Sequence, residues 1–200
     1  MIGANDPVPA KGRWKKLLLA QAIALLVVFG AVAAWRLLAR KPPALSADTA
    51  ARLADPKTRA EELLHLGRVR KPAAVPEIHK HLHDPDVEVR RAATWALAEI
   101  ADLQSADAVV KLSADTDAQV RQNVGRMLGA VYNDSCAEAL AQLLTDADDA
   151  VRMATAQGLV SADLTPSAAP ALVAGLKDSI PRIRDFVARA AGRLARQNVV

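Results

Sequence analysis

One 17-residue motif recurs four times along this chain, and its even spacing constrains the fold more than any other feature. The copies read DPDVEVRRAATWALAEI, DTDAQVRQNVGRMLGAV, DADDAVRMATAQGLVSA and DSIPRIRDFVARAAGRL. They begin at Asp84, Asp115, Asp146 and Asp178, so that successive copies are 31, 31 and 32 residues apart. Self-similarity at such a fixed period is typical of stacked helical units, each of which covers the hydrophobic face of its neighbour.

Apolar residues recur every four positions within each copy, as they do on one face of an α-helix. The three columns are Val89, Val120, Val151 and Ile183, then Ala93, Val124, Thr155 and Val187, then Leu97, Leu128, Leu159 and Ala191. Another column precedes the copies and predicts a further helix in each unit: Ile78, Val109, Leu140 and Leu172. Each unit is therefore expected to be a helix–turn–helix, and a weaker copy that begins at Asp55 predicts one more unit at the N-terminal end.

The motif resembles a known repeat in its most regular copy. The pattern D-x-x-x-x-V-R-x-x-A-x-x-A-L, which resembles the HEAT repeat, is found at Asp84, Val89, Arg90, Ala93, Ala96 and Leu97. The spacing is similar to that of the short HEAT-like repeats of phycobilisome lyases, and the resemblance covers residues 45–200. It implies an all-α fold, a right-handed α-solenoid of about five HEAT-like hairpins, and a family that usually binds other proteins.

A stretch of 19 residues without charge, Leu17–Trp35, lies before the repeats. As a helix it would span roughly 28 Å, which is close to the hydrocarbon thickness of a bilayer. Candidate anchor residues lie at its ends: Trp14, Lys15, Lys16, Trp35 and Arg36. The stretch therefore predicts an N-terminal transmembrane helix. A secretory signal peptide that is cleaved after Ala33 is the alternative.

These features divide the chain into a basic tail (1–16), a transmembrane helix (17–38), a linker (39–47) and a HEAT-like repeat domain (48–200). Residues 1–44 hold seven basic groups and one acidic group, a net charge of +6, whereas the rest of the chain has a net charge of −2. The excess of basic residues before the span predicts a single-pass protein of the bacterial inner membrane, with the repeat domain in the periplasm. The nearly neutral repeat domain argues against nucleic-acid binding.

Two charged columns follow the repeat and form a predicted structural ladder. They consist of Asp84, Asp115, Asp146 and Asp178, and of Arg90, Arg121, Arg152 and Arg184. Each arginine is expected to bind an aspartate or the turn carbonyls, because a one-dimensional stack needs repeated nearest-neighbour contacts. An anion-binding stripe is the functional alternative.

Other residues of the same helices lie off the buried arc, two or six positions after the first apolar column. The second helices of a solenoid line its concave surface, so these residues predict a partner-binding ribbon: Arg91, Trp95, Gln122, Arg126, Met153, Gln157 and Arg189. Exposed tryptophan and arginine are frequent interface anchors. The alternative for Trp95 is packing between neighbouring repeats.

The sequence offers few candidates for catalysis or metal binding. His79 and His83 share a helix face, but no third ligand is placed, so no metal site is predicted. Cys136 is the only cysteine and is expected to be a structural thiol. No phosphate-binding glycine loop, nucleophile elbow or paired-carboxylate arrangement stands out. We therefore expect no enzymatic activity, no cofactor and no small-molecule substrate.

Together these features predict a membrane-tethered scaffold or assembly factor whose concave face binds a protein partner, itself membrane-associated. Two alternatives stay open. One is a HEAT-like lyase, or an accessory subunit of one, that acts on a bound cofactor. The other is a periplasmic repeat protein that is secreted after signal cleavage.

Overall fold

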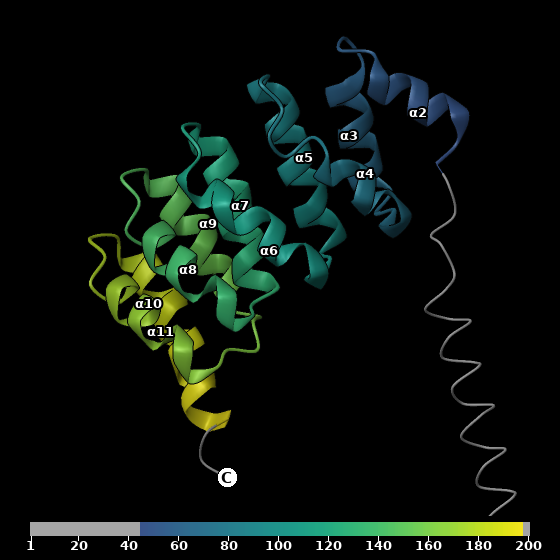
Figure 1. The fold of residues 1–200 in the computed structure, drawn as a ribbon. Helices are drawn as coiled ribbons and strands as arrows, with labels where there is room; N and C mark the ends of the chain where they lie inside the picture. Colours follow the sequence, from purple (N-terminus) through teal and green to yellow (C-terminus); the bar gives the residue numbers. More distant parts are fainter. Residues whose placement is uncertain (1–44, 198–200) are drawn as a thin grey trace, which may run out of the picture. The chain divides into compact units, whose positions relative to one another are not determined.

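The computed structural model describes residues 45–197, apart from the Leu103 side chain, and this part of the chain is entirely helical (Figure 1). Its α-helices are α2 (Ala47–Ala54), α3 (Arg59–Arg68), α4 (Val75–His79), α5 (Val87–Ile100), α6 (Ala106–Val109), α7 (Ala118–Ala130), α8 (Ala137–Leu143), α9 (Asp149–Leu159), α10 (Ala169–Gly175) and α11 (Pro181–Gln197). Its short 3₁₀ segments are η1 (Pro72–Ala74), η2 (Leu103–Ser105), η3 (Val110–Ala114), η4 (Asp134–Cys136) and η5 (Pro166–Ala168). The predicted all-α fold is confirmed for these residues.

The helices pair into consecutive hairpins, α2–α3, α4–α5, α6–α7, α8–α9 and α10–α11, which follow one another along a stack (Figure 1). The second helices of adjacent hairpins pack on one another: α3 on α5, α5 on α7, α7 on α9 and α9 on α11. The first helices form the other layer, in which α8 contacts η3 and α10. This is the stacked helix–turn–helix arrangement that the 31-residue period predicts, and the weaker copy at Asp55 supplies α2 and α3.

An aspartate side chain marks the start of three of the second helices. Asp86, Asp117 and Asp148 precede α5, α7 and α9, and each accepts a hydrogen bond from a main-chain amide of the first turn, at 2.8 to 3.0 Å. A carboxylate at this position satisfies an amide that the helix leaves free, and it lies at the positive end of the helix dipole. The Asp-x-Asp sequence of the first three full copies therefore determines where these helices begin.

The three apolar columns of the second helices form a core that runs through the stack. Eleven of their twelve residues are at most 1% exposed, and the exception, Ala191 of the last repeat, is half-buried. Full burial of one valine or leucine side chain stabilises the folded state by about 2 kcal/mol. Because every repeat contributes to the same core, each hairpin depends on its neighbours for most of this stabilisation.

Adjacent second helices approach most closely at glycines. A Cβ atom on Gly129 of α7 would lie 2.9 Å from the main chain of Gly158 in α9. A Cβ atom on Gly67 of α3 would lie 2.7 Å from Cα of Ala96 in α5. Carbon atoms do not pack at such distances, so the observed helix separation requires glycine at both positions.

No helix of residues 45–197 is long and apolar enough to cross a membrane. The longest one, α11, has 17 residues, and five of them are arginines. This finding contradicts the predicted localisation, a single-pass protein of the bacterial inner membrane with a periplasmic repeat domain, and we do not retain it. The predicted span (17–38) and the predicted anchor residues lie outside the described residues: Trp14, Lys15, Lys16, Trp35 and Arg36. The described helices belong to one compact unit, Leu45–Val200.

Candidate functional site

Three of the four arginines of the predicted ladder, and Arg59 of the weaker copy, bind the aspartate of the next repeat, and we call each such pair a rung. The fourth, Arg184, donates to the carbonyls of its own turn, Asp178 and Ser179. The rungs are Arg59–Asp84, Arg90–Asp115, Arg121–Asp146 and Arg152–Asp178. In the second rung, Nε and Nη2 of Arg90 lie 2.9 and 3.2 Å from the two carboxylate oxygens of Asp115. Nη1 of Arg90 also donates to the carbonyl of Asp84 at 3.0 Å. One guanidinium thus joins the turn of its own repeat to the turn of the next.

The aspartate of a rung also holds its own turn together. Oδ1 of Asp115 accepts a hydrogen bond from the Asp117 amide at 2.9 Å, and Oδ1 of Asp146 accepts one from the Asp148 amide at 2.9 Å. The side chains of Asp115 and Asp146 are only 8% exposed. Their oxygens and the arginine nitrogens are therefore occupied within the chain, which favours inter-repeat pairing over an anion-binding stripe.

The rungs hold the pKa values of their aspartates below the ordinary value. For Asp146 the largest cause is the hydrogen bond from Arg121. Burial alone would raise the pKa of Asp115, but the hydrogen bonds from Arg90 and from the Asp117 amide outweigh burial and lower it. The pKa values of Asp84 and Asp178 are lowered in the same way, against the effect of burial.

We expect the free energy of unfolding to fall as the solution is acidified below about pH 4. A carboxylate with a lowered pKa in the folded chain contributes its full stabilisation above its unfolded pKa, near 3.8, and loses it as the pH falls through the folded value. Urea unfolding between pH 7 and pH 2.5 measures this dependence. The Asp115→Asn variant should be less stable at pH 7 and lose less on acidification, whereas a pH profile as steep as that of the unaltered chain would contradict the expectation.

Arg91, a predicted partner-binding residue, lies in another ion pair between repeats. Its Nε and Nη2 lie 2.9 and 2.6 Å from the two carboxylate oxygens of Asp117, and its Nη1 lies 2.7 Å from Oε1 of Glu88. The hydrogen bond from Arg91 lowers the pKa of Asp117 to about 2. The polar end of Arg91 is thus engaged by its own chain, although the side chain is 37% exposed. Its role in partner binding stays a prediction.

Trp95 packs between repeats and also lines a hollow on the second helices. A Cβ atom on Gly67 of α3 would lie 2.7 Å from Cζ3 of Trp95, so the half-buried indole lies directly against α3. The hollow, which we call the Trp95 hollow, has a volume of about 210 Å³. It is lined from α3, α5 and α7 by Ala60, Leu64, Glu88, Arg91, Ala92, Trp95, Gln119 and Asn123. The arrangement matches the predicted sideways packing of Trp95 and leaves part of its surface facing the hollow.

The other predicted ribbon residues lie outside the Trp95 hollow. Nη2 of Arg126 lies 3.4 Å from Oε1 of Glu99, and Nη2 of Arg189 lies 2.7 Å from Oδ2 of Asp185. Among the uncharged members, Gln122 and Met153 are half-buried, and Gln157 is exposed. The structure therefore brings only two of the seven ribbon residues together at the hollow, and the partner-binding roles of all seven stay predictions.

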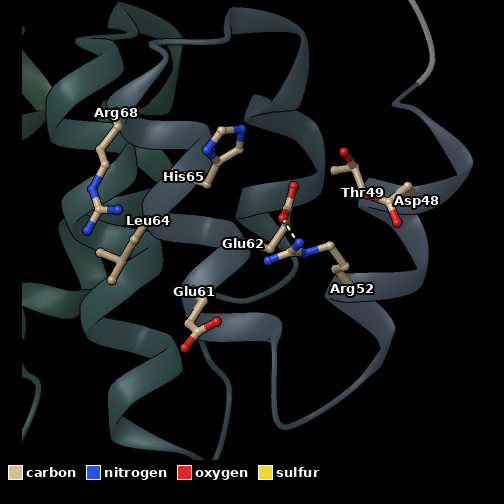
Figure 2. Close-up of a pocket in the computed structure, with 8 residues that line it drawn as sticks. All are labelled: Asp48, Thr49, Arg52, Glu61, Glu62, Leu64, His65 and Arg68. Atoms are coloured by element: carbon tan, nitrogen blue, oxygen red, sulfur yellow. Dashed lines mark ion pairs between the residues drawn. The ribbon is translucent and has the colours of Figure 1, made fainter.

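A larger hollow, of about 600 Å³, lies between α2 and α3 and is absent from the sequence-based predictions (Figure 2). It is lined by Asp48, Thr49, Arg52, Glu61, Glu62, Leu64, His65 and Arg68. Arg52 and Glu62 point toward each other across it, with 2.8 Å between Nε and Oε2, and Glu62 is only 4% exposed (Figure 2). The weaker copy does contain a signal for this pair, because Glu62 occupies the core column that holds Ala93, Val124, Thr155 and Val187 in the other copies.

The histidines and the cysteine do not form a site with other ligands. Among residues 45–197, no group of three or more histidine, cysteine, aspartate or glutamate side chains could hold a metal ion. Nε2 of His79 lies 2.7 Å from Oγ of Ser105, and His83 is exposed. Cys136 is fully buried, and burial raises the pKa of its thiol. A raised pKa disfavours the thiolate, which is the nucleophilic form.

Comparison with known proteins agrees with the geometry of the stack. No curated protein matches the chain. An engineered protein, a target of the Northeast Structural Genomics Consortium, is similar with a TM-score of 0.59 and 24% sequence identity, over 75% of this chain and 80% of that chain. The complex of CpcE and CpcF of phycocyanin lyase from Nostoc sp. PCC7120 contains a chain that is similar with a TM-score of 0.58 and 22% identity, over 79% of this chain and 68% of that chain. At 24% and 22% sequence identity, these two similarities show a shared fold and no shared function.

The family comparison covers most of the sequence. The model that describes HEAT repeats matches residues 47–123 and 106–192, which together reach every hairpin from α2–α3 to α10–α11. The rungs between successive repeats and the shared core explain why the match extends over consecutive copies. This chain belongs to the HEAT-repeat family.

Proposed function

We propose that this protein is a non-catalytic HEAT-repeat scaffold that binds a protein partner over the face of its second helices, with the Trp95 hollow as the anchoring position. The observation that carries the proposal is the hollow itself, in which apolar side chains from α3 and α5 lie beside polar side chains from α5 and α7. Protein interfaces commonly combine an apolar anchor with surrounding polar groups, and tryptophan is enriched among their energetically important residues.

The size of the Trp95 hollow supports a protein ligand. Its volume of about 210 Å³ is below the roughly 300 to 1,000 Å³ of typical small-molecule sites. A hollow of this size fits one large apolar side chain of a partner. The Arg91 guanidinium and the Asn123 side chain lie beside it, so the flanking part of the partner would be polar.

The proposal predicts cross-linking to a protein at the Trp95 hollow. With a photoreactive amino acid in place of Gln119, the full chain in its native cells should form a discrete protein adduct, because Gln119 is exposed and lines the hollow. The same amino acid in place of the exposed Gln104 of η2 should form none. Electrophoresis and mass spectrometry of the adducts measure both.

Two variants in which arginine replaces an alanine provide the matched control for this experiment. Ala60→Arg fills the Trp95 hollow and should abolish the adduct, whereas Ala130→Arg, on an exposed position of α7 outside the hollow, should leave it intact. Equal adducts from positions 119 and 104, or an adduct that persists in Ala60→Arg, would remove the proposed site.

A second candidate function is an accessory role in a lyase, with a cofactor in the larger hollow between α2 and α3. That hollow, at about 600 Å³, falls within the usual range of small-molecule sites. The fold is similar to that of a chain in a phycocyanin lyase complex, and this similarity is the reason for naming a lyase as the class of enzyme. A cofactor that co-purifies with the chain and is lost in Arg52→Ala would favour it over the scaffold.

A further inference from the structure

Helix α11 carries four arginines and one phenylalanine in a single row along its surface. We call this row the basic stripe, and its members are Arg182, Phe186, Arg189, Arg193 and Arg196. Successive members are three or four residues apart, so they lie within an arc of about 80° on the helix and extend over about 21 Å. The residues that α11 buries against the stack lie on a different side: Ile183, Val187 and Ala190.

The basic stripe lies on the same face of the second helices as the Trp95 hollow. The positions of α5 that are equivalent to its first three members hold Glu88, Ala92 and Trp95, and all three of these residues line the hollow. Helix α11 itself packs on α9 and α10. A partner that covers this face can therefore contact the hollow at α5 and the stripe at α11.

Positive charge is concentrated on α11. The positions of α5, α7 and α9 that are equivalent to the first four members of the stripe hold one basic residue, Arg126, whose Nη2 lies 3.4 Å from Oε1 of Glu99. Helix α11 contains five arginines and one aspartate, a net charge of +4, whereas residues 45–176 have a net charge of −6. The last helix is thus a basic surface at one end of an otherwise acidic repeat domain.

Most guanidinium groups of the stripe are open to an external anion. Within the described part of the chain, Arg182 and Arg196 form no ion pair, and both are exposed. The side chains of Arg189 and its partner Asp185 are 62% and 54% exposed, so a ligand can reach this pair. Arg193 is the most engaged member, because its Nη1 donates to the carbonyl of the residue that follows α9, at 2.9 Å.

Phe186 holds two of these arginines in place. The Cζ atoms of Arg182 and Arg189 lie 5.7 and 5.9 Å from the centre of its ring, within the range of a cation–π interaction. The half-buried ring packs against the core of the stack, which fixes its position. Binding of an anion to both guanidinium groups therefore costs less side-chain freedom than binding to two unrestrained arginines.

Arg182 lies where a basic residue does not favour the helix. It is in the first turn of α11, at the positive end of the helix dipole, and this turn contains no acidic residue. Helices α5 and α9 instead have Glu88 and Asp149 in their first turns. A bound anion would offset the repulsion between Arg182 and the helix dipole, which no acidic residue of this turn offsets.

We propose that the basic stripe binds an acidic segment of the protein partner, a run of aspartate and glutamate side chains that lies along α11. The inference rests on the proposed function, because it takes the partner to be a protein on the face of the second helices, and it adds the chemistry of the segment that α11 receives. Charge complementarity selects an acidic segment, and a segment one chain wide contacts the stripe alone. A membrane or a nucleic acid is a broader polyanion, whose approach the net charge of −6 on residues 45–176 opposes.

Binding of a fluorescent heptaglutamate peptide to the full chain, measured by anisotropy, tests this inference. An extended peptide of this length spans about 23 Å, close to the length of the stripe. The double substitution Arg182→Ala with Arg196→Ala should weaken binding about five-fold, because it removes two exposed charges that face the peptide. The basic groups of residues 1–44 are shared by all variants, so the difference between variants reports on the stripe.

Lys57→Ala with Lys111→Ala is the matched control. Both lysines are exposed and lie outside the stripe, and their removal changes the net charge by the same amount. The affinity of this variant should stay within about two-fold of that of the unaltered chain, since charges farther away than the Debye length are screened. An equal loss in the two double variants would overturn the inference, because the peptide would then respond to net charge alone.

Phe186→Leu tests the stripe without a change in charge. Leucine keeps an apolar side chain against the core but removes the ring that holds Arg182 and Arg189, and the affinity for the peptide should fall about three-fold. Circular dichroism establishes that the variant keeps its helical content. An affinity equal to that of the unaltered chain would contradict a preorganised stripe.

Other probes distinguish the class of ligand and separate this inference from the proposed function. If single-stranded DNA or vesicles that contain phosphatidylserine bind more tightly than the peptide, with the same loss in Arg182→Ala with Arg196→Ala, the assignment to a protein segment is wrong. A discrete protein adduct at position 119 in a chain that binds no peptide would overturn the stripe and leave the Trp95 hollow as the binding site.

Discussion

Gly129→Ala is expected to lower the free energy of unfolding by about 2 kcal/mol. The new methyl group would lie 2.9 Å from main-chain atoms of Gly158 and Leu159, and these atoms cannot move without separating α7 from α9. Overpacking of this kind costs about 3 kcal/mol, from which the better helix propensity of alanine recovers about 1 kcal/mol. Urea unfolding followed by circular dichroism measures the change.

Gly192→Ala is the matched control, because Gly192 occupies the same column in the last repeat. A Cβ atom there has no neighbour closer than 3.8 Å, so the substitution should stabilise the chain by up to about 1 kcal/mol through helix propensity alone. The two alanine substitutions should therefore have opposite signs. Equal effects at the two positions would mean that α7 and α9 are not packed as described.

Asp146→Ala is expected to lower the free energy of unfolding by about 3 kcal/mol, because it removes one partner of a buried ion pair and leaves the other uncompensated. The Arg121 side chain is 17% exposed and that of Asp146 is 8% exposed, so little water can replace the lost carboxylate. The substitution also frees the Asp148 amide, to which Oδ1 of Asp146 is bonded at 2.9 Å. Thermal and urea unfolding both report the loss.

Asp163→Ala provides the comparison for a surface pair. Asp163 lies 3.6 Å from Arg193 with its side chain 93% exposed, and pairs of this kind contribute little to stability. No measurable change is expected at this position. A loss as large as that of Asp146→Ala would show that the two carboxylates act through net charge rather than through their specific contacts.

The periodic part of the fold could be predicted from the sequence. A residue such as Val120 faces the same surroundings as Val89, because each repeat packs on a copy of itself. The same reasoning predicted that Arg90 and Arg121 contact aspartates or turn carbonyls, and the structure shows both kinds of contact. Repetition supplies several independent examples of one environment, which is why these positions could be assigned from one chain.

Residues that differ from copy to copy were harder to place. The helical angle puts Trp95 off the buried arc, but the angle does not reveal that Gly67 leaves room for the indole on the neighbouring helix. For the same reason the pairing of Arg91 with Asp117 could not be predicted, since it depends on the distance between α5 and the cap of α7. A contact that occurs in only one repeat cannot be inferred by comparing that repeat with the others.

The predicted localisation was wrong for a different reason. It relied on the apolar stretch Leu17–Trp35, which lies outside the described residues, and no helix of residues 45–197 is long and apolar enough to cross a membrane. Glu62 was missed although its position in a core column could be read from the alignment of the weaker copy. A charged residue in an apolar column predicts a partner of opposite charge, here Arg52 on the preceding helix.

If the arginine and aspartate columns hold neighbouring repeats together rather than bind external anions, Arg90 and Asp115 must be coupled in folding. A double-mutant cycle with Arg90→Ala, Asp115→Ala and the double variant measures that coupling directly. We predict a coupling free energy of about 2 kcal/mol, against a much smaller value for the more exposed pair Arg126 and Glu99. A coupling near zero for Arg90 and Asp115, together with stabilisation of the chain by added phosphate, would contradict the ladder and restore the anion-binding stripe.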